Sequence, residues 1–125
     1  MSNEIKYGSS MALTNGTLTD GISASGLVAN QTNARLVRNV QTLAVSSAEG
    51  DLISLGGVVV PGIASFSNLD TANYLEIGIQ VTGTFYPFIK LKAGQQSGPL
   101  FLGTSAIYGR ANTADVKLFY VIYDS

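Results

Sequence analysis

Residues 74–95, YLEIGIQVTGTFYPFIKLKAGQ, carry the clearest structural signal in the chain. In the first part of this stretch, every second side chain is apolar: Leu75, Ile77, Ile79 and Val81. The alternation returns at Ile89 and Leu91, which are separated by a lysine. Because successive side chains of a β-strand point to opposite faces, this period of two predicts two strands, each with one face in a core and one in solvent. Thr-Gly-Thr at residues 82–84 and Ala-Gly at residues 93–94 are the turns expected after them.

Three aromatic residues, Phe85, Tyr86 and Phe88, surround Pro87 between the two alternating segments. They allow three interpretations: a ligand groove, a platform for nucleic acid, or the aromatic tip of an ordinary strand. Proline has no N–H to donate to a β-ladder, so the second strand should lie at a sheet edge or bend at this point. We predict a strand tip whose aromatic side chains cap the core or contact a neighbouring protein.

Glycine, threonine and β-branched residues recur along the chain, with turn signals roughly every ten residues, which predicts an all-β domain. Asn15-Gly16 indicates a tight turn within residues 8–26, which otherwise read as loop or short edge strands. Residues 33–45 fit a helical stripe, but their valines and threonine favour a strand. Residues 64–74 read mostly as loop. Further strands are predicted at residues 26–30, at residues 56–62, where Pro61 ends the strand, and at residues 100–102 and 107–108.

The last predicted strand, residues 115–124, is apolar on both faces. One face carries Val116, Leu118, Tyr120 and Ile122, and the other carries Phe119, Val121 and Tyr123. Such a strand is either central in a sandwich or covered on its outer face by another subunit. Because a terminal strand is not an obvious central strand, we predict that the second face forms a contact between subunits.

Composition limits the partners that this chain can have. Of its 125 residues 46% are apolar and only 12% are charged, and the formal net charge is −1. A chain of this size fits one domain. Its near-neutral charge provides no field that would hold a polyanion or an anionic membrane, so we expect neither nucleic acid nor membrane as a partner. No secretory signal core or membrane span is apparent, which favours synthesis in the cytoplasm.

Histidine and cysteine are absent from the sequence, which excludes Ser-His-Asp and Cys-His nucleophile systems and the usual zinc sites. Carboxylate pairs remain as candidates for acid–base chemistry or calcium binding: Glu49 with Asp51, and Asp70 with Glu76. The Glu-Gly-Asp segment reads better as a solvated hairpin tip. We therefore predict no catalytic residue, no metal site and no cofactor.

Two ligand-binding alternatives stay open. Three basic residues near the aromatic tip could complete a stacking platform for nucleic acid: Lys90, Lys92 and Arg110. Aromatic residues in β domains more often form core or subunit contacts, which favours the structural interpretation. Three tyrosines near polar loops could stack on sugar rings, although the lack of tryptophan weakens this idea: Tyr74, Tyr86 and Tyr108.

The order of these segments resembles that of the small β-sandwich or jelly-roll proteins that decorate or cement the capsids of tailed bacteriophages. The resemblance covers most of the chain and rests on YGSSMALT (residues 7–14), VANQTNARLV (28–37), the stretch 74–95, LFLGTSAIYGRANTADVKL (100–118) and the apolar final strand. These are strand and turn residues rather than a chemical signature. The resemblance implies a trimeric virion protein on the outside of the shell, with the major capsid protein and its own copies as partners and with no catalytic residues.

We expect one domain over residues 1–125, a jelly-roll-like antiparallel β-sandwich, in which residues 1–10 are either an extended N-terminal arm or a frayed terminus. The expected function is that of a non-enzymatic capsid decoration or cement protein, made in the host cytoplasm and located on the virion. Subunit or capsid contacts are expected at two groups of residues: Phe119, Val121 and Tyr123, and Phe85, Tyr86 and Phe88. The alternative function is that of a small tail or fibre-associated protein that binds a host surface glycan.

Overall fold

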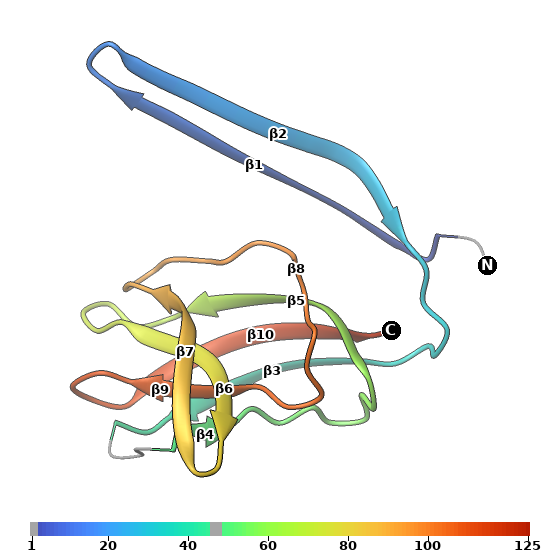
Figure 1. The fold of residues 1–125 in the computed structure, drawn as a ribbon, viewed down its shortest axis with the longest axis vertical. Helices are drawn as coiled ribbons and strands as arrows, with labels where there is room; N and C mark the ends of the chain where they lie inside the picture. Colours follow the sequence, from blue (N-terminus) through green and yellow to red (C-terminus); the bar gives the residue numbers. More distant parts are fainter. Residues whose placement is uncertain (1–2, 46–48) are drawn as a thin grey trace.

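The computed structural model describes residues 3–45 and 49–125, and it is all-β. A long antiparallel hairpin comes first and projects from the rest of the molecule: β1 (Ile5–Asn15) and β2 (Leu18–Ala29) (Figure 1). The β10 sheet follows, with four antiparallel strands in the spatial order β3 (Leu36–Leu43), β10 (Val116–Asp124), β5 (Pro61–Asn68) and β8 (Leu100–Phe101). The β6 sheet also has four, in the order β4 (Asp51–Leu52), β9 (Tyr108–Ala111), β6 (Leu75–Val81) and β7 (Thr84–Leu91).

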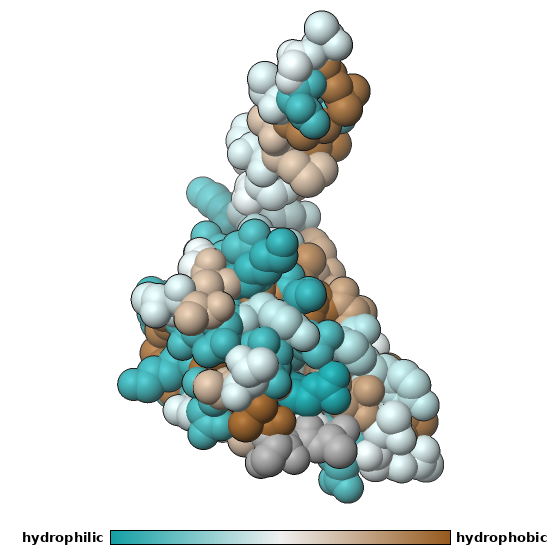
Figure 2. All heavy atoms as spheres, turned by 90° about the vertical axis from the view of Figure 1, so that its left-hand side faces the viewer, coloured by the Kyte–Doolittle hydropathy of each residue, from teal (hydrophilic) through white to brown (hydrophobic). Residues whose placement is uncertain are grey.

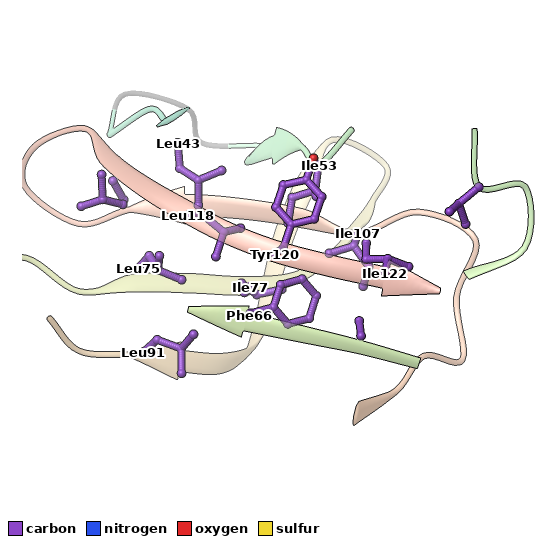
Figure 3. Packing of buried hydrophobic residues seen from close by; sticks show 14 residues of the cluster. Leu43, Ile53, Phe66, Leu75, Ile77, Leu91, Ile107, Leu118, Tyr120 and Ile122 are labelled. Atoms are coloured by element: carbon purple, nitrogen blue, oxygen red, sulfur yellow. The ribbon is translucent and has the colours of Figure 1, made fainter. Parts of the chain in front are cut away.

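The two four-stranded sheets pack face to face in a sandwich-like arrangement, and their facing side chains form the core (Figure 3). The largest side chains in it come from both sheets and are fully buried: Leu43, Phe66, Leu75, Ile77, Leu118, Tyr120 and Ile122. The one hydroxyl among them is paired, because Tyr120 Oη donates a hydrogen bond to the Ser54 carbonyl oxygen at 2.6 Å. The core is thus closed within the sandwich and does not involve the projecting hairpin.

The stretch 74–95 forms two adjacent strands, as its alternation predicts. Leu75 and Ile77 of β6 are fully buried, and Leu91 of β7 is 5% exposed. Val81 was expected on the same core face but is 48% exposed, at the end of β6 beyond the irregularity after Ile77. Between the strands, Thr82 and Gly83 both have positive φ, of 48° and 80°, which is the pattern of a type I′ hairpin turn.

Pro87 lies both in an edge strand and at a bend, which confirms the prediction that it would be found at one or the other. β7 is the edge strand of the β6 sheet, and the register shifts between Ile77 and Gly78, where Gly78 pairs with Pro87. A Cβ on Gly78 would overlap the Tyr86 carbonyl oxygen and lie 2.7 Å from Pro87 Cα. Glycine at this position is therefore what lets the two backbones approach at the irregularity.

Three predicted segments were wrong in whole or in part. Residues 64–74, predicted to be mostly loop, include the second part of β5, residues 64–68. Residues 8–26 are not loop or short edge strands but most of the β1–β2 hairpin, although the predicted turn at Asn15-Gly16 is confirmed, with Asn15 paired to Leu18. Residues 56–60 are turns and bends, and the strand begins at Pro61 instead of ending there. Proline is tolerated as the first residue of a strand because that position need not donate to the ladder.

The last strand also differs from expectation, because β10 lies inside its sheet. It pairs with β3 on one side and with β5 on the other. Its inward residues Leu118, Tyr120 and Ile122 are fully buried, as predicted. The expectation that such a strand would not be central is wrong. β10 comes last in the sequence but lies between β3 and β5, which both precede it.

Candidate interaction surfaces

The β1–β2 hairpin, here called the arm (residues 5–29), is an amphipathic ribbon. Directly opposed residues in an antiparallel pair point to the same face. One face carries the larger apolar side chains, in the pairs Ser9–Ala24, Met11–Ile22, Leu13–Asp20 and Asn15–Leu18. The other face is small or weakly polar, in the pairs Ser10–Ser23, Ala12–Gly21 and Thr14–Thr19. The arm therefore has one face suited to packing and one suited to water.

The apolar face is buried only where the arm leaves the sandwich. Ile5 is 7% exposed, whereas Met11 is 72% exposed, Ile22 66%, Leu18 59% and Leu13 47%. Figure 2 shows the arm projecting from the sandwich, with hydrophobic residues gathered along one side of it. An isolated two-stranded hairpin is marginally stable in water. The distal apolar face is thus the part of the described chain that most needs a partner.

Sequence reasoning missed this face although a signal for it existed. Met11 and Leu13 occupy alternate positions before the Asn-Gly turn, and Leu18 and Ile22 occupy alternate positions of their own strand after it. Serine, threonine and glycine between them lowered the contrast of the pattern. Of the predicted N-terminal arm, residues 5–10 lie in β1, and Met1 and Ser2 are outside the described residues.

At its base the arm covers part of the outer face of the β10 sheet. The rings of Tyr7 and Phe101 meet edge to face, with centroids 5.4 Å apart and an interplanar angle of 78°. A cavity of about 240 Å³ lies between arm and sheet, lined among others by Ile5, Tyr7, Ile63, Val121 and Tyr123. Farther out, Met11 and Ile22 face a second open groove, which Ser97 and Pro99 border on the sandwich side. The space between arm and sheet therefore opens toward the β8 side.

A hydrogen-bonded joint fixes the base of the arm to the end of β10. Gln31 Nε2 donates to the Arg35 carbonyl oxygen at 3.0 Å and to the Asp124 carbonyl oxygen at 2.9 Å. The Gln31 backbone N–H donates to the Glu4 carboxylate at 2.9 Å. These bonds join the residues just before β1 and just after β2 to the sandwich, so the direction in which the arm leaves is set locally.

Asp124 is the buried carboxylate of this joint. Its side chain accepts hydrogen bonds from the N–H groups of Val59, at 3.1 Å, and Val60, at 3.2 Å, and it lies 3.7 Å from the Arg35 guanidinium. Burial by itself would raise its pKa, but the backbone donors of Val59, Val60 and Ser125 and the positive charge of Arg35 outweigh burial and hold the pKa below its ordinary value. The carboxylate is therefore a structural acceptor in its ionised form.

The β3 side of the β10 sheet forms a second apolar surface, here called the β3–β10 face. It carries the outward residues of the two strands: Leu36, Arg38, Val40, Thr42, Lys117, Phe119, Val121 and Tyr123. Leu36 is 58% exposed and Val40 48%. The Arg38 guanidinium lies 5.1 Å from the centroid of the Phe119 ring. All three predicted contact residues of the last strand lie on this outer side and are half-buried in the single chain.

The other three predicted contact residues lie on the β6 sheet, away from the Phe119 group. Tyr86 is 53% exposed and Phe88 59%, so both are available at the surface. Phe85 is 5% exposed and packs beneath Arg110, whose guanidinium lies 4.8 Å from the ring centroid. Phe88 also lines a shallow groove with Thr104 and Tyr108, among other residues.

Four of the basic and acidic candidates have side-chain partners within the chain: Lys90, Arg110, Glu76 and Asp51. Lys90 Nζ lies 4.0 Å from the centroid of the Tyr74 ring, and Arg110 forms a salt bridge of 3.0 Å with Glu76. Asp51 accepts a hydrogen bond of 2.7 Å from the Ala44 N–H. Over residues 3–45 and 49–125, no group of three or more acidic side chains is placed to hold a metal ion.

Asp70 caps the loop before β6. Its carboxylate accepts hydrogen bonds from the N–H groups of Asn73, at 2.6 Å, and Ala72, at 3.0 Å. These donors, that of Asn73 above all, lower its pKa below the ordinary value, which matches a turn-forming role.

The part of the chain that the structure describes contains no helix long and apolar enough to cross a membrane. Comparison with protein-family models, with curated proteins and with solved structures finds no match to this chain. The arm and the β3–β10 face, both defined by their geometry, are thus the surfaces on which a functional argument rests.

Proposed function

We propose that this chain is a non-enzymatic structural protein of a tailed-phage virion, which binds the outside of the capsid as a decoration or cement protein and acts as a homo-oligomer, expected to be a trimer. The observation that carries the proposal is the arm, whose distal apolar face is exposed, together with a second exposed apolar face on the sandwich. Apolar surfaces of this kind mark sites of protein–protein contact.

The strand order supports a jelly-roll interpretation of the sandwich. Within residues 3–45 and 49–125, eight strands follow the arm, four in each sheet, and all their pairings are antiparallel. From β3 to β10 the chain changes sheet at every connection except the β6–β7 hairpin. Jelly rolls have eight strands in two sheets and occur in viral capsid and lectin domains. Because one fold serves many functions, this agreement favours the proposal without deciding it.

The proposed mechanism is stabilisation by mass action. A protein that binds the assembled shell more tightly than its separated subunits shifts the equilibrium toward the shell. Each copy contributes contacts to the major capsid protein and to neighbouring copies, and many such contacts together reach an avidity that one contact does not. The arm supplies the reach that such lateral contacts require.

Co-sedimentation with undecorated capsids tests the proposal. The protein should pellet with the shells and raise the temperature at which they release their genome. Ile22→Asp, on the apolar face of the arm, should weaken binding at least about tenfold, which corresponds to about 1.4 kcal/mol. Thr19→Asp, on the opposite face, is the matched control and should bind like the parent protein. If the parent protein leaves the shells unbound and their release temperature unchanged, the proposal is wrong.

The groove beside Phe88 favours one alternative, a tail or fibre-associated protein that binds a host surface glycan. An exposed aromatic ring beside hydroxyl groups suits stacking on a sugar, and this groove also contains Thr104 and Tyr108. Under this alternative, Phe88→Ala abolishes binding to host cells or to a glycan array, and neither the parent protein nor the variant pellets with shells.

A further inference from the structure

Two apolar surfaces of this chain are left open within the described residues, and they complement one another. They are the distal face of the arm and the part of the β3–β10 face around Val40, which the arm base does not border. We propose that the distal arm of one copy, residues 9–24, packs on the β3–β10 face of a second copy. Every copy then gives one arm and receives one. The inference rests on the proposed self-association and states which surfaces form the contact between copies. It does not depend on binding to the capsid.

The position of the arm argues against its packing on the same face of its own chain. Across the β10 sheet the strand order is β3, β10, β5, β8, so β3 and β8 are opposite edges. The arm base borders the β3–β10 face at Val121 and Tyr123 and packs on Phe101 of β8. The middle of the arm lies over Ser97 and Pro99, which precede β8. From there the arm leads away from the sandwich (Figure 1). Val40, on the opposite edge strand, remains 48% exposed.

Charge gives the pairing a preferred orientation. The apolar face of the distal arm carries one charged residue, Asp20, which is paired across the strands with Leu13 and forms no salt bridge with any described residue. The β3–β10 face carries two cations, Arg38 and Lys117, and no acid among the outward residues of β3 and β10. An apolar ribbon with one anion thus meets an apolar sheet with two cations, a complementarity that suppresses the wrong registers.

The size of the contact favours an exchange in which each copy both gives and receives. The distal ribbon measures about 23 Å by about 10 Å at standard strand dimensions, or about 230 Å² for one face. Burying it against a sheet removes about 460 Å² in total, less than the roughly 1,000 Å² of a specific interface. A reciprocal exchange between two copies places two such contacts in one interface, about 900 Å² in total and near that limit. In a closed ring such as a trimer each interface holds one contact of about 460 Å², and every copy takes part in two such interfaces, which reinforce one another when the ring closes.

Disulfide trapping tests the contact directly, because the natural chain has no cysteine. Asp20→Cys and Arg38→Cys are made in separate chains, which are mixed at high concentration without shells and mildly oxidised. A covalent dimer of the two variants is expected on a non-reducing gel. Thr19→Cys mixed with Arg38→Cys is the matched control, since Thr19 lies beside Asp20 on the opposite face of the arm, and it should give at least about tenfold less dimer.

A chain that carries both Asp20→Cys and Arg38→Cys identifies the source of the arm. Exchange between copies gives covalent multimers, whereas a disulfide within one chain shows that the arm closes on its own sheet and overturns the proposal. Equal trapping through Thr19→Cys, or no trapping with either variant, also overturns it. The trapping experiment contains no shells, so it is independent of capsid binding. If the disulfide forms but the protein does not bind capsids, only the proposed function is wrong. If the protein binds capsids but the disulfide does not form, only this inference is wrong.

Discussion

The sandwich and the arm are built from the same alternation of side chains but differ in what their apolar faces contact. In the sandwich, the apolar faces of two sheets meet, and residues such as Ile77 and Leu118 are fully buried. In the arm, the apolar face of a single two-stranded ribbon meets solvent over its distal half, and Met11 is 72% exposed. Alternation specifies which side chains share a face, but the rest of the molecule decides whether that face is covered.

This difference separates two sources of stability. The sandwich derives its stability from area buried within the chain, at about 25 cal/mol for each Å² of apolar surface. The distal arm has its cross-strand pairs and little further burial, so its stability should depend on a partner. The two regions therefore ought to respond differently to the same kind of substitution.

Removing a large side chain from each region should give the largest contrast. Phe66→Ala deletes a fully buried ring in the core and should lower the free energy of unfolding by about 3–5 kcal/mol. Met11→Ala removes an exposed side chain in the arm and should change it by less than about 0.5 kcal/mol. Chemical denaturation of dilute protein, followed by circular dichroism, measures both. A loss of several kcal/mol for Met11→Ala would show that the arm belongs to the cooperative core.

Acid should weaken the joint between the two regions. Because the pKa of Asp124 is lower in the folded chain than its ordinary value of 3.8, the ionised carboxylate stabilises the fold fully above about pH 4. That contribution is lost as the pH falls through the lowered folded pKa. Asp124→Asn should reduce the melting temperature at pH 7, since its amide nitrogen would replace one of the two oxygens that accept from the N–H groups of Val59 and Val60.

Below about pH 4 the melting temperature of the Asp124→Asn variant should fall less steeply with decreasing pH than that of the parent chain. The reason is that the variant lacks the proton that Asp124 takes up on unfolding. Melting curves between pH 2 and pH 7 give the comparison, with Asp20→Asn, an exposed position, as the control that keeps the parental slope. An unchanged slope in Asp124→Asn would mean that the acid sensitivity of the fold originates elsewhere.

The sequence predicted the sandwich better than the arm for a physical reason. Around Ile77 and Leu91 the contrast between apolar and polar positions is strong because one face must be buried. In the arm, serine, threonine and glycine can occupy either face without cost, so the pattern is weak although the strands are long. The central place of β10 was not predictable from local pattern, since strand order depends on contacts between residues far apart in the chain.

The candidate surfaces were predictable only in part, for a related reason. The outward position of Phe119, Val121 and Tyr123 follows from parity within one strand, and the structure places all three on the outer side of the sheet. The burial of Phe85 beneath Arg110 does not follow from parity, because Arg110 lies on β9, two strands away across β6. A local pattern can thus say which side chains share a face, whereas it cannot say which other strand covers them.

The smallest predicted effect isolates the shape of the arm. Tyr7 pairs with Leu27 and Ser9 with Ala24, so β2 has one residue more than β1 between these two pairs. Gly26 lies at this irregularity and adopts a φ of 67°. Gly26→Ala places a Cβ in the left-handed region and should destabilise the arm by about 1 kcal/mol. Gly21→Ala, in the regular part of β2 with the Met11 carbonyl oxygen 3.7 Å from the added Cβ, should instead stabilise it by up to about 1 kcal/mol. Hydrogen exchange should therefore quicken in the arm for the first variant and slow for the second, with the amides of β10 unchanged. Equal changes in β10 would mean that arm and sandwich unfold as one unit, and the distinction between the two regions would fail.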